Sequence, residues 1–178
     1  MFTFAEIKLM KKITILIASF VILSCSSDDD QKQLPLTMNG SNSVEYTFNG
    51  EKMSSFDSDE DAKEIQCGFT ITNTWIHIKL GKNDVYSTLT ISANTLLEEG
   101  KTYQIKGSLN SNVRAFNEYY GPNIQYVNCG TNNEVGGTIT ITKLDYTNRI
   151  IAATFSYDCI GDKDKIYTVR DGWFDLKF

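Results

Sequence analysis

The fold is decided by one stretch, GTITITKLDYTNRIIAATFSYDC at residues 137–159. Two isoleucines alternate with threonines in its first part, a polar turn follows at residues 145–148, and mostly apolar residues then occupy alternate positions from Ile151 to Cys159. A period of two is typical of strands that bury one face and expose the other. We therefore expect two antiparallel strands joined by this turn.

A third strand is expected over residues 166–178. Apolar residues near its end share one parity, at Phe174, Leu176 and Phe178. The Asp171-Gly172 pair interrupts the alternation before them and predicts a β-bulge. The last third of the chain should therefore be a three-stranded meander.

The same alternation extends through the preceding part of the chain. It recurs at residues 44–48, 65–71, 76–80 and 85–91, with turns rich in Gly, Asn and Asp between the stretches. Helical periodicity is not convincing anywhere after residue 42, and residues 92–99 are expected to form at most one short helical turn. The sequence predicts an all-β fold: an antiparallel β-sandwich or partly open barrel of about eight to ten short strands.

Composition limits the classes of function. The 178-residue chain is 41% hydrophobic and has a formal net charge of −5, which suits one folded domain rather than two. Residues 1–24 hold three lysines and one glutamate, so the remaining chain carries −7. An acidic domain without a basic run lacks the electrostatic footprint of nucleic-acid binding, and we expect no nucleic-acid partner.

The N-terminal residues have the pattern of a secretory signal. Lys11 and Lys12 precede an apolar stretch at residues 13–23, which is too short to span a bilayer and is followed by the small residue Ser24. We expect residues 1–24 to be a signal peptide, with Met10 as an alternative start.

The end of this segment, Ile22-Leu23-Ser24-Cys25, resembles the lipobox of bacterial lipoproteins, in which the cysteine becomes the acylated N-terminus. The resemblance implies a lipid anchor on Cys25 that holds the protein at a membrane. Several acyl chains on one residue give the stable anchoring that a single chain does not. In the general lipoprotein pattern, Ser26 after the cysteine argues against retention in the inner membrane.

The residues after Cys25 resemble the acidic tract that sends lipoproteins of the Bacteroidota to the outer face of the outer membrane: Ser26, Ser27, Asp28, Asp29 and Asp30. The alternative is a solvated linker whose charges only keep the tether extended. Residues 31–42 are polar and turn-rich. We therefore expect a lipidated tether at residues 25–42 and a single β domain at residues 43–178.

The quoted stretch and its continuation also resemble the ending of a family of small, uncharacterised lipoproteins of the Bacteroidota. The matching segments are GTITITKLD, ATFSY and DGWFD, together with Phe48-Asn49-Gly50 as a first hairpin and Gly100-Lys101-Thr102-Tyr103 as a later strand. The chain departs from the family pattern at Met53 and Ala153, which are packing positions. The resemblance implies an exported all-β domain and brings no established activity.

The cysteines predict one disulfide. With Cys25 acylated, three cysteines remain for an oxidising compartment. If the polar turn sets the register of the hairpin, Cys159 returns close to Cys129, which favours a Cys129–Cys159 bridge. A Cys67–Cys159 bridge is the main alternative, because both residues share the inward parity. In the favoured pairing Cys67 is a buried free thiol.

Trp75 and His77 are expected on the outer face of one strand, opposite in parity to Ile76 and Ile78. An exposed tryptophan stacks on sugar rings or anchors a partner protein, so both residues are candidates for a binding site. The alternatives are cover of Trp75 by a loop or by the linker, and an ordinary surface histidine. A single histidine cannot build a multi-histidine zinc site.

Residues 110–133 form the least regular segment. Tyr119 and Tyr120 precede Gly121-Pro122 among several asparagines, a composition found in recognition loops. We therefore count both tyrosines as candidate binding residues. The alternative is a set of strands and turns whose tyrosines help to fill the sandwich.

Other chemistry has little support. The acidic run at residues 57–61 lacks the glycine and the final glutamate of a calcium loop, which favours a solvated loop. The chain contains no phosphate-binding loop, nucleophile elbow or dinucleotide fingerprint, and no pair of acids stands out for glycoside hydrolysis. We expect no catalytic residue, cofactor or metal.

These observations lead to three hypotheses. The first is an outer-membrane lipoprotein at the cell surface whose domain is a non-enzymatic binding module for a glycan or a partner protein. The second is a periplasm-facing structural or accessory lipoprotein of an envelope complex. The third, a hydrolase, has the least support.

Overall fold

The computed structural model describes residues 37–70, 72–107, 112–122 and 124–178. These residues form eleven strands, two single-turn 3-10 helices and no α-helix, which confirms the all-β prediction. The elements are β1 Ser43–Phe48, β2 Glu51–Ser54, η1 Glu60–Ala62, β3 Glu64–Phe69, β4 Thr74–Lys82, β5 Val85–Ala93, β6 Thr102–Ile105, β7 Val113–Gly121, β8 Ile124–Gly130, β9 Gly137–Asp145, β10 Ile150–Ile160, η2 Asp162–Asp164 and β11 Ile166–Lys177.

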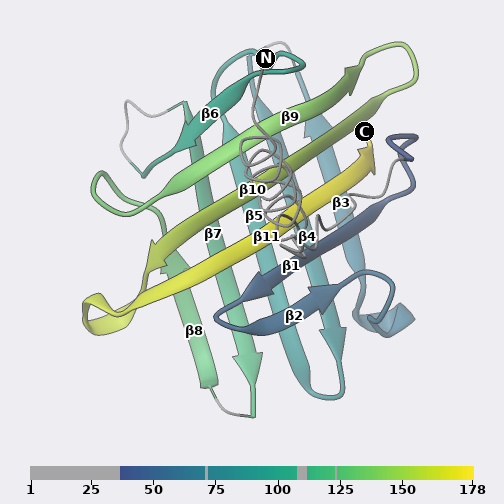
Figure 1. Cartoon of the computed structure of the whole chain (residues 1–178). Coiled ribbons are helices and arrows are strands. Elements are labelled where there is room, and N and C mark those ends of the chain that lie inside the picture. Colours follow the sequence, from purple (N-terminus) through teal and green to yellow (C-terminus); the bar gives the residue numbers. More distant parts are fainter. Residues whose placement is uncertain (1–36, 71, 108–111, 123) are drawn as a thin grey trace, which may run out of the picture. The chain divides into compact units, whose positions relative to one another are not determined.

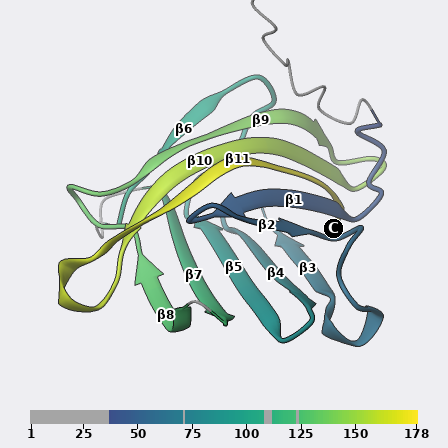
Figure 2. The same ribbon diagram turned by 60° about the horizontal axis from the view of Figure 1, so that its bottom comes forward.

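The strands of the domain stack in two layers (Figures 1 and 2). One layer has the order β2, β1, β11, β10, β9 and β6, and the other has β7, β5, β4 and β3, with β8 beside β7. Every pair is antiparallel except β6 with β7. Strands β6, β7, β8, β10 and β9 also close a ring, in which Ile105–Val113 and Ile160–Gly130 are single-residue junctions. The fold therefore combines the features of a sandwich and a partly open barrel, as the sequence predicts.

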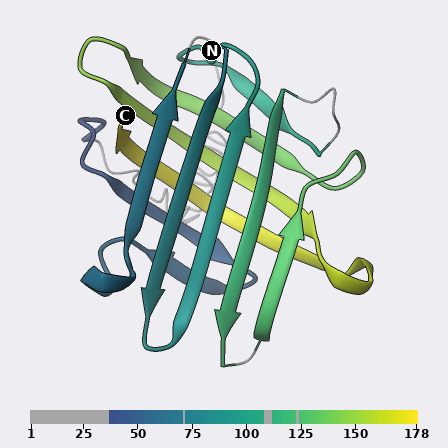
Figure 3. The same cartoon turned by 180° about the vertical axis from the view of Figure 1, so that it is seen from behind.

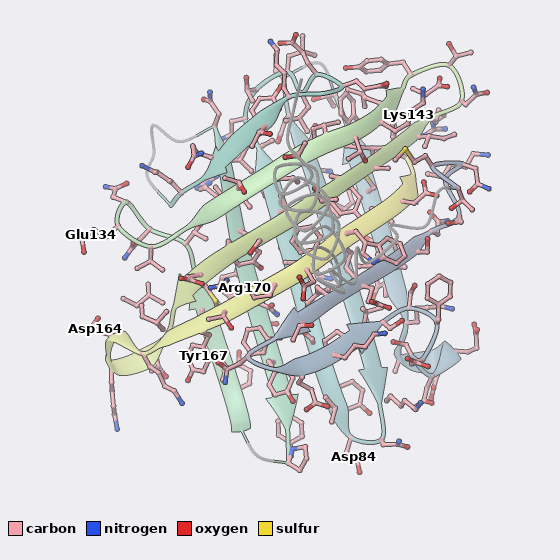
Figure 4. The ribbon with its side chains drawn as sticks, in the orientation of Figure 1. Asp84, Glu134, Lys143, Asp164, Tyr167 and Arg170 are labelled. Atoms are coloured by element: carbon pink, nitrogen blue, oxygen red, sulfur yellow. A yellow bond between two sulfur atoms is a disulfide. The ribbon has the colours of Figure 1, made fainter. Side chains whose placement is uncertain are left out.

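The C-terminal meander is confirmed. Strand β10 pairs with β9 on one side and with β11 on the other. The pairing of β10 with β11 shifts register between Val169 and Gly172 of β11, so the predicted bulge is present. Arg170, labelled in Figure 4, donates hydrogen bonds of 2.9 Å to the carbonyl oxygens of Tyr157 and Val169. It also forms an ion pair with Asp158.

Two hairpins end in the turns that their sequences predict. Asn49 and Gly50 both have positive φ angles, 47° and 92°, between the paired residues Phe48 and Glu51. Two consecutive positive φ angles match the right-handed twist of the flanking strands, and Asn-Gly adopts them at little cost. The Asn83-Asp84 turn joins β4 to β5 in the same way.

The core lies between the two layers and follows the expected parity. Val44, Tyr46 and Phe48 of β1 are fully buried, as are the inward-facing residues of β4 and the end of β11. The buried Tyr46 hydroxyl hydrogen-bonds to Ser87 Oγ at 2.8 Å, and Asn117 Nδ2 donates to the same oxygen at 2.9 Å. Burial raises the pKa of the Tyr46 phenol, so it remains a neutral hydrogen-bonding group.

The structure decides two local alternatives. Residues 92–99 form the end of β5 and an irregular connection, so the short helical turn considered there does not form. Residues 113–121 and 124–130 are the paired strands β7 and β8, which confirms the alternative of strands and turns over that of a recognition loop. The alternation in this segment places Val113, Ala115 and Asn117 inside, and burial of that face outweighs the turn-forming composition.

The expected boundary between tether and domain also changes. Residues 37–42 precede β1, yet they are held on the domain by Asp175 of β11. The Asp175 side chain is 2% exposed and lies on the face of β11 that points away from the sandwich core. Its carboxylate accepts backbone hydrogen bonds from three residues of this segment: Asn39, Gly40 and Ser41. The last residues of the expected linker therefore belong to the folded domain.

Candidate functional site

The outer face of the layer formed by β3, β4, β5, β7 and β8 carries the candidate site, and we call it the platform face (Figure 3). Strand alternation sends one set of side chains into the core and the other set onto this face. Five large aromatic side chains on it are at least 36% exposed: Trp75, Tyr86, Phe116, Tyr120 and Tyr126. A single face therefore holds a cluster of solvent-exposed rings.

Three of these rings lie opposite glycines. Trp75 pairs directly with Gly68 across the strands, Tyr86 with Gly81, and Phe116 with Gly130. A Cβ atom on Gly68 would lie 2.2 Å from Nε1 of Trp75, so the indole occupies the space where a side chain at this position would stand. Packing against a bare backbone limits the motion of the ring while 42% of Trp75 stays exposed. The Trp75 indole, and the Tyr86 ring over Gly81 in the same way, therefore pack on the sheet before any ligand binds.

A groove of about 310 Å³ lies at one end of the platform face, over β5, β7 and the end of β8. Its lining residues are Thr90, Ser92, Gly107, Arg114, Ala115, Phe116, Gly130 and Thr131. Hydroxyl groups, one guanidinium and one exposed ring make up its side-chain chemistry. Among the described lining residues there is no carboxylate.

Cross-strand pairing joins Trp75 and His77 to this groove. Trp75, Ser92 and Arg114 form one row across β4, β5 and β7, so Trp75 lies two strand spacings, about 10 Å, from Arg114. In the next row, His77 lies beside Thr90, with 3.2 Å between Nδ1 and Oγ1. The structure thus brings two sequence-predicted candidates to the edge of one groove.

The two candidate tyrosines separate. Tyr120 is 50% exposed on the platform face, whereas Tyr119 is 5% exposed and stacks on Phe48 with ring centroids 4.9 Å apart. Consecutive residues of a strand point to opposite sides of the sheet, so Tyr119 is a core residue and is wrong as a binding candidate. Tyr120 pairs with Tyr86 at the other end of the platform face.

The disulfide joins Cys129 of β8 to Cys159 of β10, with Cα atoms 5.3 Å apart. The favoured pairing is therefore confirmed, and the Cys67–Cys159 alternative is wrong. Cys129 lies in a strand, where a loop was expected. Cys67 is free and half-buried, which corrects the expected full burial. Partial burial still raises the pKa of its thiol to about 12, so Cys67 is neutral at physiological pH.

The acidic run at residues 57–61 lies in a turn and in η1. Its Asp57 lines a separate cleft of about 170 Å³ together with Glu51, Lys52 and Lys82. Two carboxylates and two lysines thus line this cleft. Across the described residues, no group of three or more His, Cys, Asp or Glu side chains is placed to hold a metal ion.

The lipidation and export residues lie outside the described part of the chain: Cys25, Ser26, Ser27, Asp28, Asp29 and Asp30. Nothing in the fold bears on them. In the described residues, no helix has the length and apolar character needed to cross a bilayer.

Comparison of the chain with protein-family models, with curated proteins and with solved structures finds no match. The function must therefore be inferred from the site itself.

Three parts of the site were missed from the sequence: Arg114, Phe116 and the glycine partners of the rings. A signal was present, because Val113 and Ala115 alternate with Arg114 and Phe116. That alternation indicates a strand that turns Arg114, Phe116, Glu118 and Tyr120 outward. The asparagines around it kept a recognition loop as an alternative.

Proposed function

We propose that this protein is a lipid-anchored surface protein whose platform face binds a glycan without converting it. One observation carries the proposal: five exposed aromatic rings share one face, where Phe116 lines a groove rich in hydroxyls and Trp75 lies beside Ser92 of that groove. Isolated exposed aromatics are common, but a cluster of this kind marks an interaction surface.

The chemistry of the face favours a glycan over a partner protein. Sugar rings present C–H groups that stack on aromatic faces and hydroxyls that exchange hydrogen bonds with Thr, Ser and Asn side chains. The row of Thr88, Thr90 and Ser92 between β4 and β7 supplies such groups along β5. From Ser92 to Tyr86 this strand spans about 20 Å, which is long enough for several sugar residues.

Binding without turnover fits the groove better than hydrolysis. Glycoside hydrolysis requires two carboxyl groups on either side of the scissile bond. Glu118 is the carboxylate next along β7, and it accepts a hydrogen bond from the Tyr126 hydroxyl at 3.2 Å. Glu118 lies four residues from Arg114 along β7, a distance of about 13 Å. The described lining of the groove therefore lacks the pair of carboxyl groups that hydrolysis requires.

The location is proposed from the sequence. The lipobox at Cys25, the acidic tract and the resemblance to Bacteroidota lipoproteins support an anchor in the outer membrane with the domain outside the cell. A glycan-binding face is useful to a cell when polysaccharide outside can reach it. A periplasm-facing accessory protein is the alternative that the location experiment tests.

Protease shaving of intact cells tests the location. We expect a C-terminally tagged wild-type protein to lose its tag, whereas the Asp28-Asp29-Asp30→Ala variant keeps it. Permeabilisation of the outer membrane should make both forms cleavable, which controls for intrinsic resistance. Protection of the wild type until permeabilisation would contradict surface exposure and support the periplasm-facing alternative.

Replacement of the groove aromatics tests glycan binding. We expect Trp75→Ala and Phe116→Ala each to weaken retention on any polysaccharide that retains the wild type by about tenfold or more, because each removes a ring that packs on the sugar. Tyr120→Ala should have a smaller effect. Affinity electrophoresis against a polysaccharide panel measures the change.

Tyr146→Ala is the matched control, because this ring is 52% exposed in the turn between β9 and β10. Its retention should equal that of the wild type. If the groove variants were retained as well as the control, the platform face would not be the binding site.

A further inference from the structure

Arg114 is the only charged residue among the described residues that line the groove. It projects from β7 in the same row as Trp75 and Ser92 and is exposed. Its guanidinium forms no ion pair or side-chain hydrogen bond with another described residue. An unpaired guanidinium beside an exposed ring has no role in packing of the core, and it is available to contact a ligand.

Several other cations of the domain are paired with carboxylates. Arg170 is paired with Asp158, Lys52 with Glu45, and Lys143 with Glu99. The protein as a whole is acidic, so Arg114 does not belong to a general basic surface that would attract any polyanion. A single cation in a groove instead indicates a local contact with one anionic group.

We propose that the groove binds an acidic glycan, with the carboxylate of a hexuronic acid residue on Arg114 and its sugar ring on Phe116. This inference rests on the proposed function and specifies its ligand class. The guanidinium has the planar donor geometry that matches a carboxylate in a bidentate pair. Arg114 and Phe116 are two residues apart on one strand face, about 6.8 Å, which allows one sugar residue to contact both.

The neighbouring side chains complete this arrangement. Ser92 lies beside Arg114 across β5 and β7, and Thr90 lies beside Phe116. Their hydroxyls face the same groove and can exchange hydrogen bonds with the sugar hydroxyls. Gly130, paired with Phe116 on the other side, leaves room for the ligand, because even a Cβ atom there would meet the Phe116 ring only at 3.6 Å.

Calorimetric titration with matched polymers tests the inference. The probes are polygalacturonate, alginate and hyaluronan, each with its carboxyl-reduced counterpart, which keeps the linkages and removes the charge. We expect the wild type to bind at least one uronate polymer about tenfold or more tightly than its reduced form. Arg114→Gln should remove this preference and leave binding to the reduced form unchanged.

Arg149→Gln is the matched control, because Arg149 is exposed in the turn between β9 and β10; it should behave as the wild type. Added salt should weaken wild-type binding to the uronate polymer more than binding to its reduced form.

Equal affinity for charged and reduced polymers, or an Arg114→Gln variant with an intact preference, would overturn the acidic-ligand assignment while leaving glycan binding in place. Binding of the wild type to neutral polysaccharides alone would also overturn the acidic-ligand assignment and leave glycan binding in place. Absence of binding to every charged and neutral polymer would overturn the proposed function as well.

Discussion

Asp175→Ala is expected to destabilise the domain by about 3 to 4 kcal/mol. The carboxylate accepts hydrogen bonds from the backbone N–H groups of Asn39, Gly40 and Ser41, at 2.8 to 3.4 Å, and from the hydroxyls of Thr37 and Ser41. When the Asp175 carboxylate is removed, the N–H and hydroxyl groups around this residue, which is 2% exposed, lose their acceptor. For a domain of this size the loss lowers Tm by roughly 10 °C.

Thermal unfolding followed by circular dichroism measures this effect. Asp175→Asn keeps the shape of the side chain but replaces one acceptor oxygen with a donor, so we expect it to lie between wild type and Asp175→Ala. Asp162→Ala, in the exposed η2 turn, is the control and should stay within about 0.5 kcal/mol of wild type. An Asp175→Ala Tm equal to that of Asp162→Ala would show that residues 37–42 are not held by this carboxylate.

Removal of the disulfide is expected to have an effect of similar size. Cys129 and Cys159 are 30 residues apart in sequence, and in the chain-entropy model a crosslink closing such a loop stabilises the fold by about 3 to 4 kcal/mol. The bridge joins β8 to β10 next to the Ile160–Gly130 junction. We therefore expect the Cys129→Ser/Cys159→Ser double variant to unfold at a lower denaturant concentration than the wild type.

Intact mass after alkylation checks the pairing on a chain of residues 26–178, which lacks Cys25 and keeps the other three cysteines. Under denaturing conditions without reductant, one cysteine should be alkylated, and after reduction three should be. Peptide mapping should place the single label on Cys67. Three labels without reductant, or a label on Cys129 or Cys159, would contradict the disulfide.

Much of the fold is predictable from the sequence because sheet formation here depends on local alternation. The meander of β9, β10 and β11 follows from apolar residues at every second position and from turns that only a few residue types favour. The register of the same hairpin favours the observed disulfide but leaves the Cys67–Cys159 pairing open. The ring closure does not follow from the sequence, because it depends on two single-residue junctions, one between the consecutive strands β6 and β7 and one between β8 and β10, which local alternation does not encode.

The candidate site is only partly predictable for the same reason. Parity alone puts Trp75 and His77 on an outer face, but it does not say which strands lie beside them. The groove exists because β5 brings Ser92 and Thr90 between β4 and β7, a neighbour relation that alternation does not encode. The composition of residues 110–133 allows both a recognition loop and packed strands, and only the strand pairing turns Tyr119 inward and its neighbour Tyr120 outward.

The fluorescence of Trp75 during a polysaccharide titration tests the glycan-binding claim most directly. The chain has two tryptophans, and Trp173→Phe leaves Trp75 as the only one. A polysaccharide that binds the platform face should shield the Trp75 indole from acrylamide. Acrylamide quenching of Trp75 fluorescence should therefore fall as the protein becomes saturated with the polysaccharide. The reciprocal Trp75→Phe variant, which reports from Trp173 alone, should show no change. Saturated binding with unchanged quenching of Trp75 would contradict a ligand on the platform face.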